Sequence, residues 1–126
     1  MKIILRIILR IIKSFSFAFE GLKTAFRQEA NFKVHVIISI IVIAAAVFLR
    51  FNPIELLILL LTIALVVILE LVNTSLETIV NLVEPDIKEQ AKIAKDISAA
   101  AVLISTGVSI AVGLLLFAPK IIALVF

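Results

Sequence analysis

Three long apolar stretches constrain the fold of this 126-residue chain more than any other feature, at residues 34–49, 54–72 and 97–117. A helix needs about 17–25 residues to cross the roughly 30 Å of bilayer hydrocarbon, and each stretch approaches or reaches that length. The stretches lack the polar face of a soluble bundle helix and the alternation of a membrane β-strand. We therefore expect an all-α integral membrane protein that forms a single membrane domain. Its transmembrane helices are expected at residues 31–50, 54–83 and 92–118.

The first 28 residues read as an amphipathic helix that lies on the membrane surface. Four basic residues, Lys2, Arg6, Arg10 and Lys13, fall within about 80° on a helix, and Ile and Leu cover the rest. A signal peptide is the alternative, but the basic residues interrupt its apolar run and no small-residue cleavage site follows. A surface helix over residues 1–28 is the favoured interpretation.

The distribution of basic residues predicts how the chain crosses the membrane. Ten Lys and Arg residues lie before the first span or in the 81–96 connection, and two lie on the other side. The positive-inside rule therefore places the N-terminus and this connection in the cytoplasm, and the C-terminus outside. The net charge of +3 indicates anionic lipid headgroups as neighbours, and no surface for stacking nucleic-acid bases is present.

Polar residues at the end of the second apolar stretch are the strongest functional signal. Glu70, Asn73 and Glu77 fall within an arc of about 60° on one helix face. An ionisable side chain in a membrane helix costs roughly 2.5–3.5 kcal/mol on insertion scales, so such a residue normally serves a function. Glu70 is expected about 6 Å inside the cytoplasmic boundary and Glu77 just beyond it. The stripe could therefore join a membrane-dissolved group to a water-soluble one.

Other candidates lie at the same depth. Glu29 precedes the first span, and Lys95 with Asp96 opens the third. Glu29 could instead be a solvated headgroup-level charge, and Lys95 and Asp96 could be ordinary helix-start charges. Carboxylates such as Glu29 and Glu77, without soft ligands, suit Mg²⁺. No Walker or protein-kinase motif is present, so these residues indicate a metal-dependent acid site at the membrane interface without naming a reaction.

Several segments resemble the prokaryotic diacylglycerol kinase family. The segment ELVNTSLETIVN at residues 70–81 is similar to its signature ExxN[ST][SA]xExxVD, and AKIAKD at 91–96, NF at 31–32 and FEGLKTAF at 19–26 agree in order and spacing. The resemblance implies a homotrimer of three-span subunits in the bacterial inner membrane. It further implies transfer of the γ-phosphate of MgATP to a lipid alcohol, in cytoplasmic sites built between neighbouring subunits.

The same resemblance implies roles for individual residues. Glu70 would be the general base, Asn73 would orient groups around it, and Glu29 and Glu77 would hold Mg²⁺ on the ATP phosphates. The remaining nucleotide contacts implied are Lys95 and Asp96, with Arg10, Phe17, Asp86 and Lys88 at the periphery.

The chain departs from the family pattern at three positions. Asn81 replaces the final Asp of the signature, and Phe17 lacks the hydroxyl that an aromatic residue can supply there. His35 replaces an acid of the diacylglycerol-using branch, and NFKVH at 31–35 resembles the undecaprenol kinases of Gram-positive bacteria. We expect undecaprenol as substrate in preference to diacylglycerol. A small proton-coupled transporter built on Glu70 is the alternative from another class, although the acidic residues gather at one side of the membrane.

Overall fold

The computed structural model describes residues 2–83 and 88–126, which form four α-helices and no strand. The expected all-α fold is confirmed over these residues. The helices are α1 (Lys2–Gln28), α2 (Ala30–Phe48), α3 (Pro53–Val83) and α4 (Glu89–Val125).

Three of these helices, α2, α3 and α4, are long and apolar enough to cross a membrane. The chain is therefore an integral membrane protein, as its sequence predicts. Helix α4 has 37 residues and a length of about 55 Å, well beyond the hydrocarbon thickness of about 30 Å. It continues through Pro119 to Val125, past the expected end at residue 118. A proline removes one backbone donor, and neighbouring segments can hold a membrane helix together at such a position.

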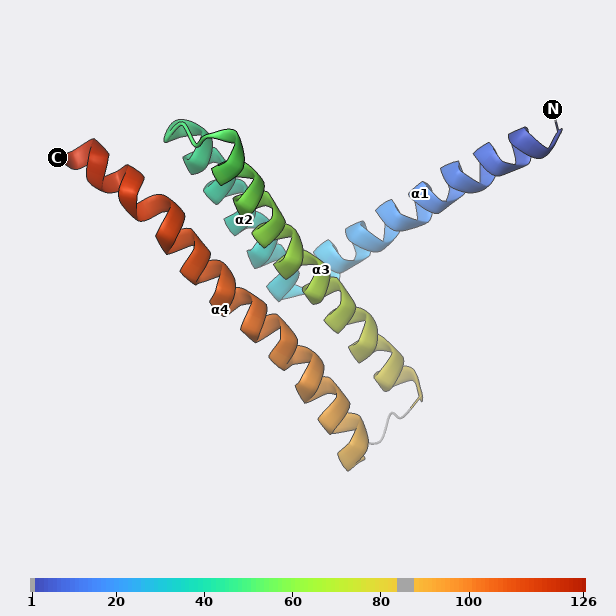
Figure 1. Cartoon of the computed structure of the whole chain (residues 1–126). Helices are drawn as coiled ribbons and strands as arrows, with labels where there is room; N and C mark the ends of the chain where they lie inside the picture. The colour runs from blue at the N-terminus through green and yellow to red at the C-terminus, as the bar shows by residue number, and fades with distance from the viewer. Residues whose placement is uncertain (1, 84–87) are drawn as a thin grey trace.

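The membrane-spanning helices α2, α3 and α4 form one bundle. Helix α3 packs against both α4 and α2. Figure 1 shows that α1 leaves this bundle crosswise, and that α3 and α4 continue past the corner between α1 and α2. The polar ends of α3 and α4 therefore extend beyond the level at which α1 meets the bundle.

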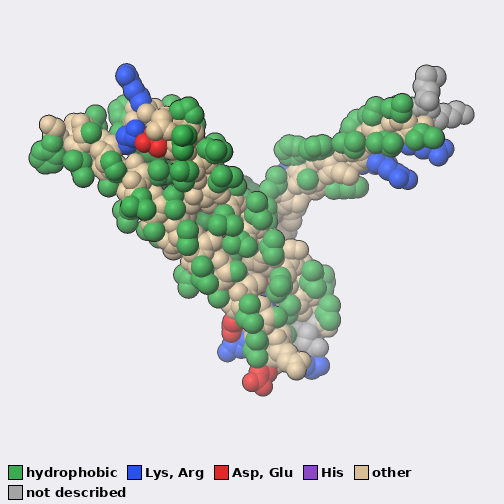
Figure 2. Space-filling view, in the orientation of Figure 1, with side chains coloured by type: hydrophobic (Ala, Val, Ile, Leu, Met, Phe, Trp, Pro, Cys, Tyr) green, Lys and Arg blue, Asp and Glu red, His purple; other side chains and the backbone are tan. Residues whose placement is uncertain are grey.

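Helix α1 has the two-sided character expected of a surface helix. Figure 2 shows hydrophobic side chains along one edge of α1 and Lys and Arg side chains along the other. A helix of this kind buries its apolar face at the boundary of headgroups and acyl chains. Its crosswise direction relative to the bundle suits that placement.

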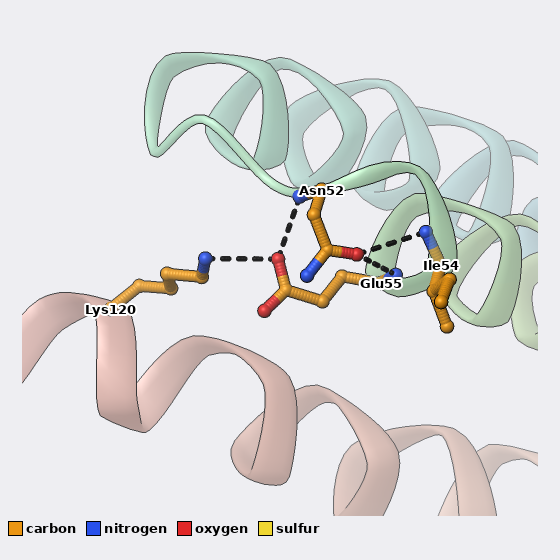
Figure 3. Close-up of polar contacts among 4 residues, drawn as sticks. All are labelled: Asn52, Ile54, Glu55 and Lys120. Carbon is orange, nitrogen blue, oxygen red and sulfur yellow. Dashed lines mark hydrogen bonds and ion pairs between the residues drawn. The ribbon is translucent and has the colours of Figure 1, made fainter.

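The turn between α2 and α3 is held by a reciprocal cap. Asn52 Oδ1 accepts hydrogen bonds from the N–H groups of Ile54 and Glu55, both at 2.9 Å, and Glu55 Oε2 accepts one from Asn52 N–H at 2.7 Å. This is a capping box, in which the cap residue and the third helical residue satisfy each other's backbone donors. Figure 3 shows Lys120 of α4 reaching Glu55, with a Nζ–Oε2 distance of 2.9 Å. The turn and the end of α4 are thereby joined.

Candidate active site

The centre of the candidate site is a pair of polar side chains that α3 buries between its neighbours. Glu70 is 2% exposed and Asn73 is 8% exposed. Both lie on the face of α3 that the sequence identifies, because residues three apart on a helix point the same way. Burying such groups in an apolar setting is costly without polar partners. The surroundings of this pair therefore decide what it can do.

Two further carboxylates and a histidine surround Glu70. Glu29, Glu77 and His35 lie close enough to act on it electrostatically. Glu29 occupies the single extended residue between α1 and α2, so the corner of the chain brings it beside α3. Glu29 and Glu77, when ionised, carry the same charge as a Glu70 carboxylate. A group of carboxylates in such a place has the electrostatic character of a cation site.

The carboxylates do not form a complete metal cage in one chain. Within residues 2–83 and 88–126, no group of three or more His, Cys, Asp or Glu side chains is arranged to hold a metal ion. Mg²⁺ needs fewer protein ligands, because it commonly uses one or two carboxylates with waters and phosphate oxygens. The donor set of Glu29 and Glu77 fits Mg²⁺ that arrives with a phosphate ligand.

Hydrogen bonds between α3 and α4 fix the orientation of Asn73. Ser98 Oγ lies 2.6 Å from Asn73 Oδ1 and 3.0 Å from the backbone carbonyl of Lys95. The hydroxyl has one proton, so it donates to one of these acceptors at a time. Closer to the C-terminal end of α3 and the N-terminal end of α4, Lys95 Nζ donates to Asn81 Oδ1 at 3.2 Å. Because its Oδ1 faces Ser98, Asn73 keeps its amide NH₂ group to donate elsewhere.

The remaining predicted residues lie at the edges of this cluster or away from it. Asp96 is exposed, and Lys88 precedes α4 at its N-cap position. Asp86 lies outside the described residues. Arg10 and Phe17 are exposed on α1, which leads away from the bundle (Figure 1). One chain therefore brings together Glu70, its acidic neighbours and the Asn73 network, but not the two α1 residues.

Comparison with known proteins identifies the family. The model of the prokaryotic diacylglycerol kinase family matches residues 16–117. The chain belongs to this family. A protein of Synechocystis named diacylglycerol kinase is 42% identical over 112 residues, which cover 88% of this chain and 64% of that protein. The Bacillus subtilis undecaprenol kinase is 36% identical over 89% of this chain and 91% of its own length. The Escherichia coli diacylglycerol kinase is 31% identical, with coverages of 80% and 83%.

The Asn81–Lys95 contact is the place where this family member differs most visibly from the signature. An aspartate at position 81 would place a negative charge within reach of the Lys95 ammonium. Asn81 instead offers a neutral amide oxygen at 3.2 Å. This contact therefore places no negative charge beside the Lys95 ammonium.

Ser98 is the one residue of this network that the sequence did not single out. It lies three positions after Lys95, so both side chains share a face of α4. In the sequence it begins a run of small residues that indicates close helix packing. The signal available in the sequence was the three-residue spacing of Lys95 and Ser98, which places the Ser98 hydroxyl opposite the polar face of α3.

Proposed function

We propose that this chain is a lipid-alcohol kinase that transfers the γ-phosphate of MgATP to a membrane lipid alcohol. The observation that carries the proposal is the burial of Glu70 at 2% exposure with Glu29 and Glu77 acting on it. This arrangement offers a base at lipid depth next to carboxylates near the aqueous boundary. Membership of the prokaryotic diacylglycerol kinase family supports the same reaction class.

Glu70 is the proposed general base. A carboxylate within reach of the lipid hydroxyl can accept its proton as the oxygen attacks the phosphoryl group. Asn73 is proposed to orient groups around this reaction through its amide NH₂. The Ser98 hydrogen bond holds the Asn73 amide in one orientation, which supports that positioning role.

Glu29 and Glu77 are the residues proposed to hold Mg²⁺. When bound, the ion neutralises phosphate charge, which provides much of the catalysis in phosphoryl transfer. Lys95 is proposed to bind the phosphates, because the contact with Asn81 places no negative charge beside its ammonium. Asp96 completes the proposed core of the nucleotide site. The peripheral contacts proposed are Arg10, Phe17, Asp86 and Lys88.

A homotrimer is proposed to complete the site. Helix α1 carries Arg10 and Phe17 away from the acidic cluster of its own chain (Figure 1). These residues can then serve the site of a neighbouring subunit. Small residues along α4, including Gly107 and Gly113, support close packing of membrane helices.

Undecaprenol is the favoured substrate and diacylglycerol the alternative. Two observations support undecaprenol: NFKVH at residues 31–35 resembles the undecaprenol kinases of Gram-positive bacteria, and the B. subtilis undecaprenol kinase aligns over almost the full length of both chains. The names of the Synechocystis and E. coli relatives support diacylglycerol. The chain is proposed to lie in the bacterial inner membrane with its N-terminus and site in the cytoplasm and its C-terminus outside, because the basic residues are distributed that way.

The transporter hypothesis has less support than the kinase. A proton path would need polar groups that lead from Glu70 toward the outer side. The hydroxyls of Ser39, Thr62 and Ser109 instead donate to backbone carbonyls of their own helices, at 2.7–2.9 Å. These contacts leave the interior surface between the helices apolar.

The test is transfer of labelled γ-phosphate from MgATP by purified protein in detergent, with undecaprenol and diacylglycerol offered separately. Labelled undecaprenyl phosphate is the expected product; labelled phosphatidic acid would support the kinase and overturn the substrate preference.

Loss of a general base should lower turnover of Glu70→Gln by about 10²- to 10⁴-fold. Glu77→Gln should raise the Mg²⁺ requirement. Glu89→Gln, at the exposed start of α4, is the matched control and should retain activity. Proton flux without ATP that depends on Glu70 would favour the transporter.

A further inference from the structure

An apolar groove of about 580 Å³ runs between α2, α3 and α4. Along α4 its lining extends from Ser109 to Ile122, a rise of about 20 Å. That length is about two thirds of the hydrocarbon thickness of a bilayer. The groove therefore lies within the membrane and follows the direction of the helices.

The wall of the groove suits a hydrocarbon chain rather than an ion or a polar ligand. Its hydroxyl-bearing residues, Ser39, Thr62 and Ser109, each donate to a carbonyl in their own helix. The hydroxyl protons are therefore hydrogen-bonded within the helices and are not directed to a molecule in the groove. The remaining lining side chains are almost all aliphatic.

One end of the groove meets the candidate active site. His35 lines the groove, and so does Val66, which lies one helical turn before Glu70 on α3. A lipid alcohol whose hydroxyl lies at Glu70 would have the start of its chain beside His35. The continuity between the acidic cluster and an apolar groove identifies the chain of the lipid alcohol as the occupant.

Contacts between the α2–α3 turn and α4 lie beside the part of the groove farthest from His35, where the lining continues past Phe117 to Ile122. Phe117 lines the groove, and its ring centroid lies 4.7 Å from that of Phe51. Lys120 Nζ lies 5.7 Å from the Phe51 ring and 2.9 Å from Glu55 Oε2. Figure 3 shows that the capping box with Asn52 holds Glu55 in position for Lys120. We refer to Phe51, Glu55, Phe117 and Lys120 as the outer clasp.

We propose that the outer clasp sets the chain-length selectivity of the enzyme by fixing the Phe117 ring in the wall of a groove that holds the chain of the lipid alcohol. This inference rests on the proposed kinase function. A chain long enough to extend past Phe117 toward Ile121 and Ile122 must fit beside a ring that packs on Phe51. Forcing extra atoms against packed side chains is unfavourable, so opening the clasp should relieve a penalty that only longer chains experience.

The test compares kcat/KM for prenols of increasing length with the full-length protein in detergent. Two variants open the clasp: Phe117→Ala removes the ring from the groove wall, and Lys120→Met breaks the ion pair without changing a groove-lining residue. Leu115→Ala is the matched control, because Leu115 is 76% exposed on the same helix and lies outside the groove. In the clasp variants, the ratio of kcat/KM for long over short prenols should rise by about fivefold, the lower end of an overpacking effect. The control should change this ratio by less than about twofold, the usual range for surface substitutions.

Two results would overturn the inference while leaving the kinase function intact. The first is an unchanged ratio in both clasp variants when wild-type protein phosphorylates the prenols. The second is a groove filled by another copy of the chain.

The natural sequence has no cysteine, so Gly113→Cys places a single thiol in the groove. A disulfide between two chains at this position would identify a protein interface, whereas cross-linking to a photoreactive long-chain prenol would support the lipid groove. Failure of wild-type protein to phosphorylate any alcohol, combined with prenol cross-linking at this position, would refute the kinase proposal and retain the groove as a lipid-chain site.

Discussion

Removing the Ser98 hydroxyl tests whether the α3–α4 hydrogen bond positions Asn73. In Ser98→Ala, Asn73 Oδ1 loses its partner at 2.6 Å while the side chain stays 8% exposed. An unsatisfied buried acceptor costs about 1–3 kcal/mol in soluble proteins. Hydrogen bonds between membrane helices contribute less, about 0.6 kcal/mol on average and up to about 1.7. Because this bond is short and its acceptor is buried, we expect a loss of stability near the upper value.

The free energy of the Ser98–Asn73 hydrogen bond also predicts how far kcat should fall. If the bond holds Asn73 in its working orientation, a loss of up to about 1.7 kcal/mol in the transition state lowers kcat by up to about 20-fold. KM for MgATP should change little, because Ser98 is not among the residues proposed to bind the nucleotide. The assays are steady-state phosphorylation and unfolding in mixed detergent followed by helical circular dichroism.

A second buried serine provides the control for Ser98. Ser105 is 4% exposed, and its hydroxyl donates at 2.8 Å to the Val102 carbonyl within α4. Ser105→Ala removes a buried hydroxyl whose hydrogen bond lies within α4, so it should be nearly neutral for kcat. A Ser98→Ala variant with the stability and kcat of Ser105→Ala would refute the reasoning. In a double-mutant cycle with Asn73→Ala, the two effects should be strongly non-additive.

Two further predictions concern the outer half of the bundle. Ala46 is fully buried in α2, so Ala46→Leu should destabilise the protein by about 1–3 kcal/mol through overpacking. Ala44→Leu, at an exposed position of the same helix, should not. Equal unfolding midpoints of the two variants in detergent would contradict this prediction. Asn52→Ala should cost about 1 kcal/mol of stability because it removes the acceptor for two backbone N–H groups of α3. Asn52→Asp should retain most of that stability. Equal losses in the two variants, measured by the same unfolding assay, would show that the cap contributes little.

The sequence predicted those features that depend on one helix at a time. Length and hydropathy identify the spans because hydrocarbon thickness fixes how many apolar residues a helix needs. The burial of Glu70 follows from the same physics, since a carboxylate at that depth must face protein or water. Both conclusions need only the order of residues along one segment.

Features that depend on two helices were harder to predict. Ser98 looks like a packing residue until α3 and α4 are aligned so that it meets Asn73. The outer clasp joins Glu55 to Lys120, which are far apart in the sequence and unremarkable alone. Pro119 suggests the end of a helix, yet α4 continues through it, beside the contacts of Phe117 and Lys120. Register between helices is set by such pairs, and a single segment does not reveal it.

A mixing experiment tests whether each site is shared between chains, with α1 of one chain contributing to the site of its neighbour. Arg10 lies on α1, which leads away from the bundle of α2, α3 and α4 in its own chain (Figure 1). Chains with Arg10→Ala and chains with Glu70→Gln should each have low activity. When the two are co-expressed in equal amounts and assemble at random, about one quarter of sites built between neighbouring subunits contain both native residues. If each site is built within one chain, none does. Activity near one quarter of wild type would support the shared site, whereas activity no higher than the mean of the two parents would assign Arg10 no role in a neighbour's site.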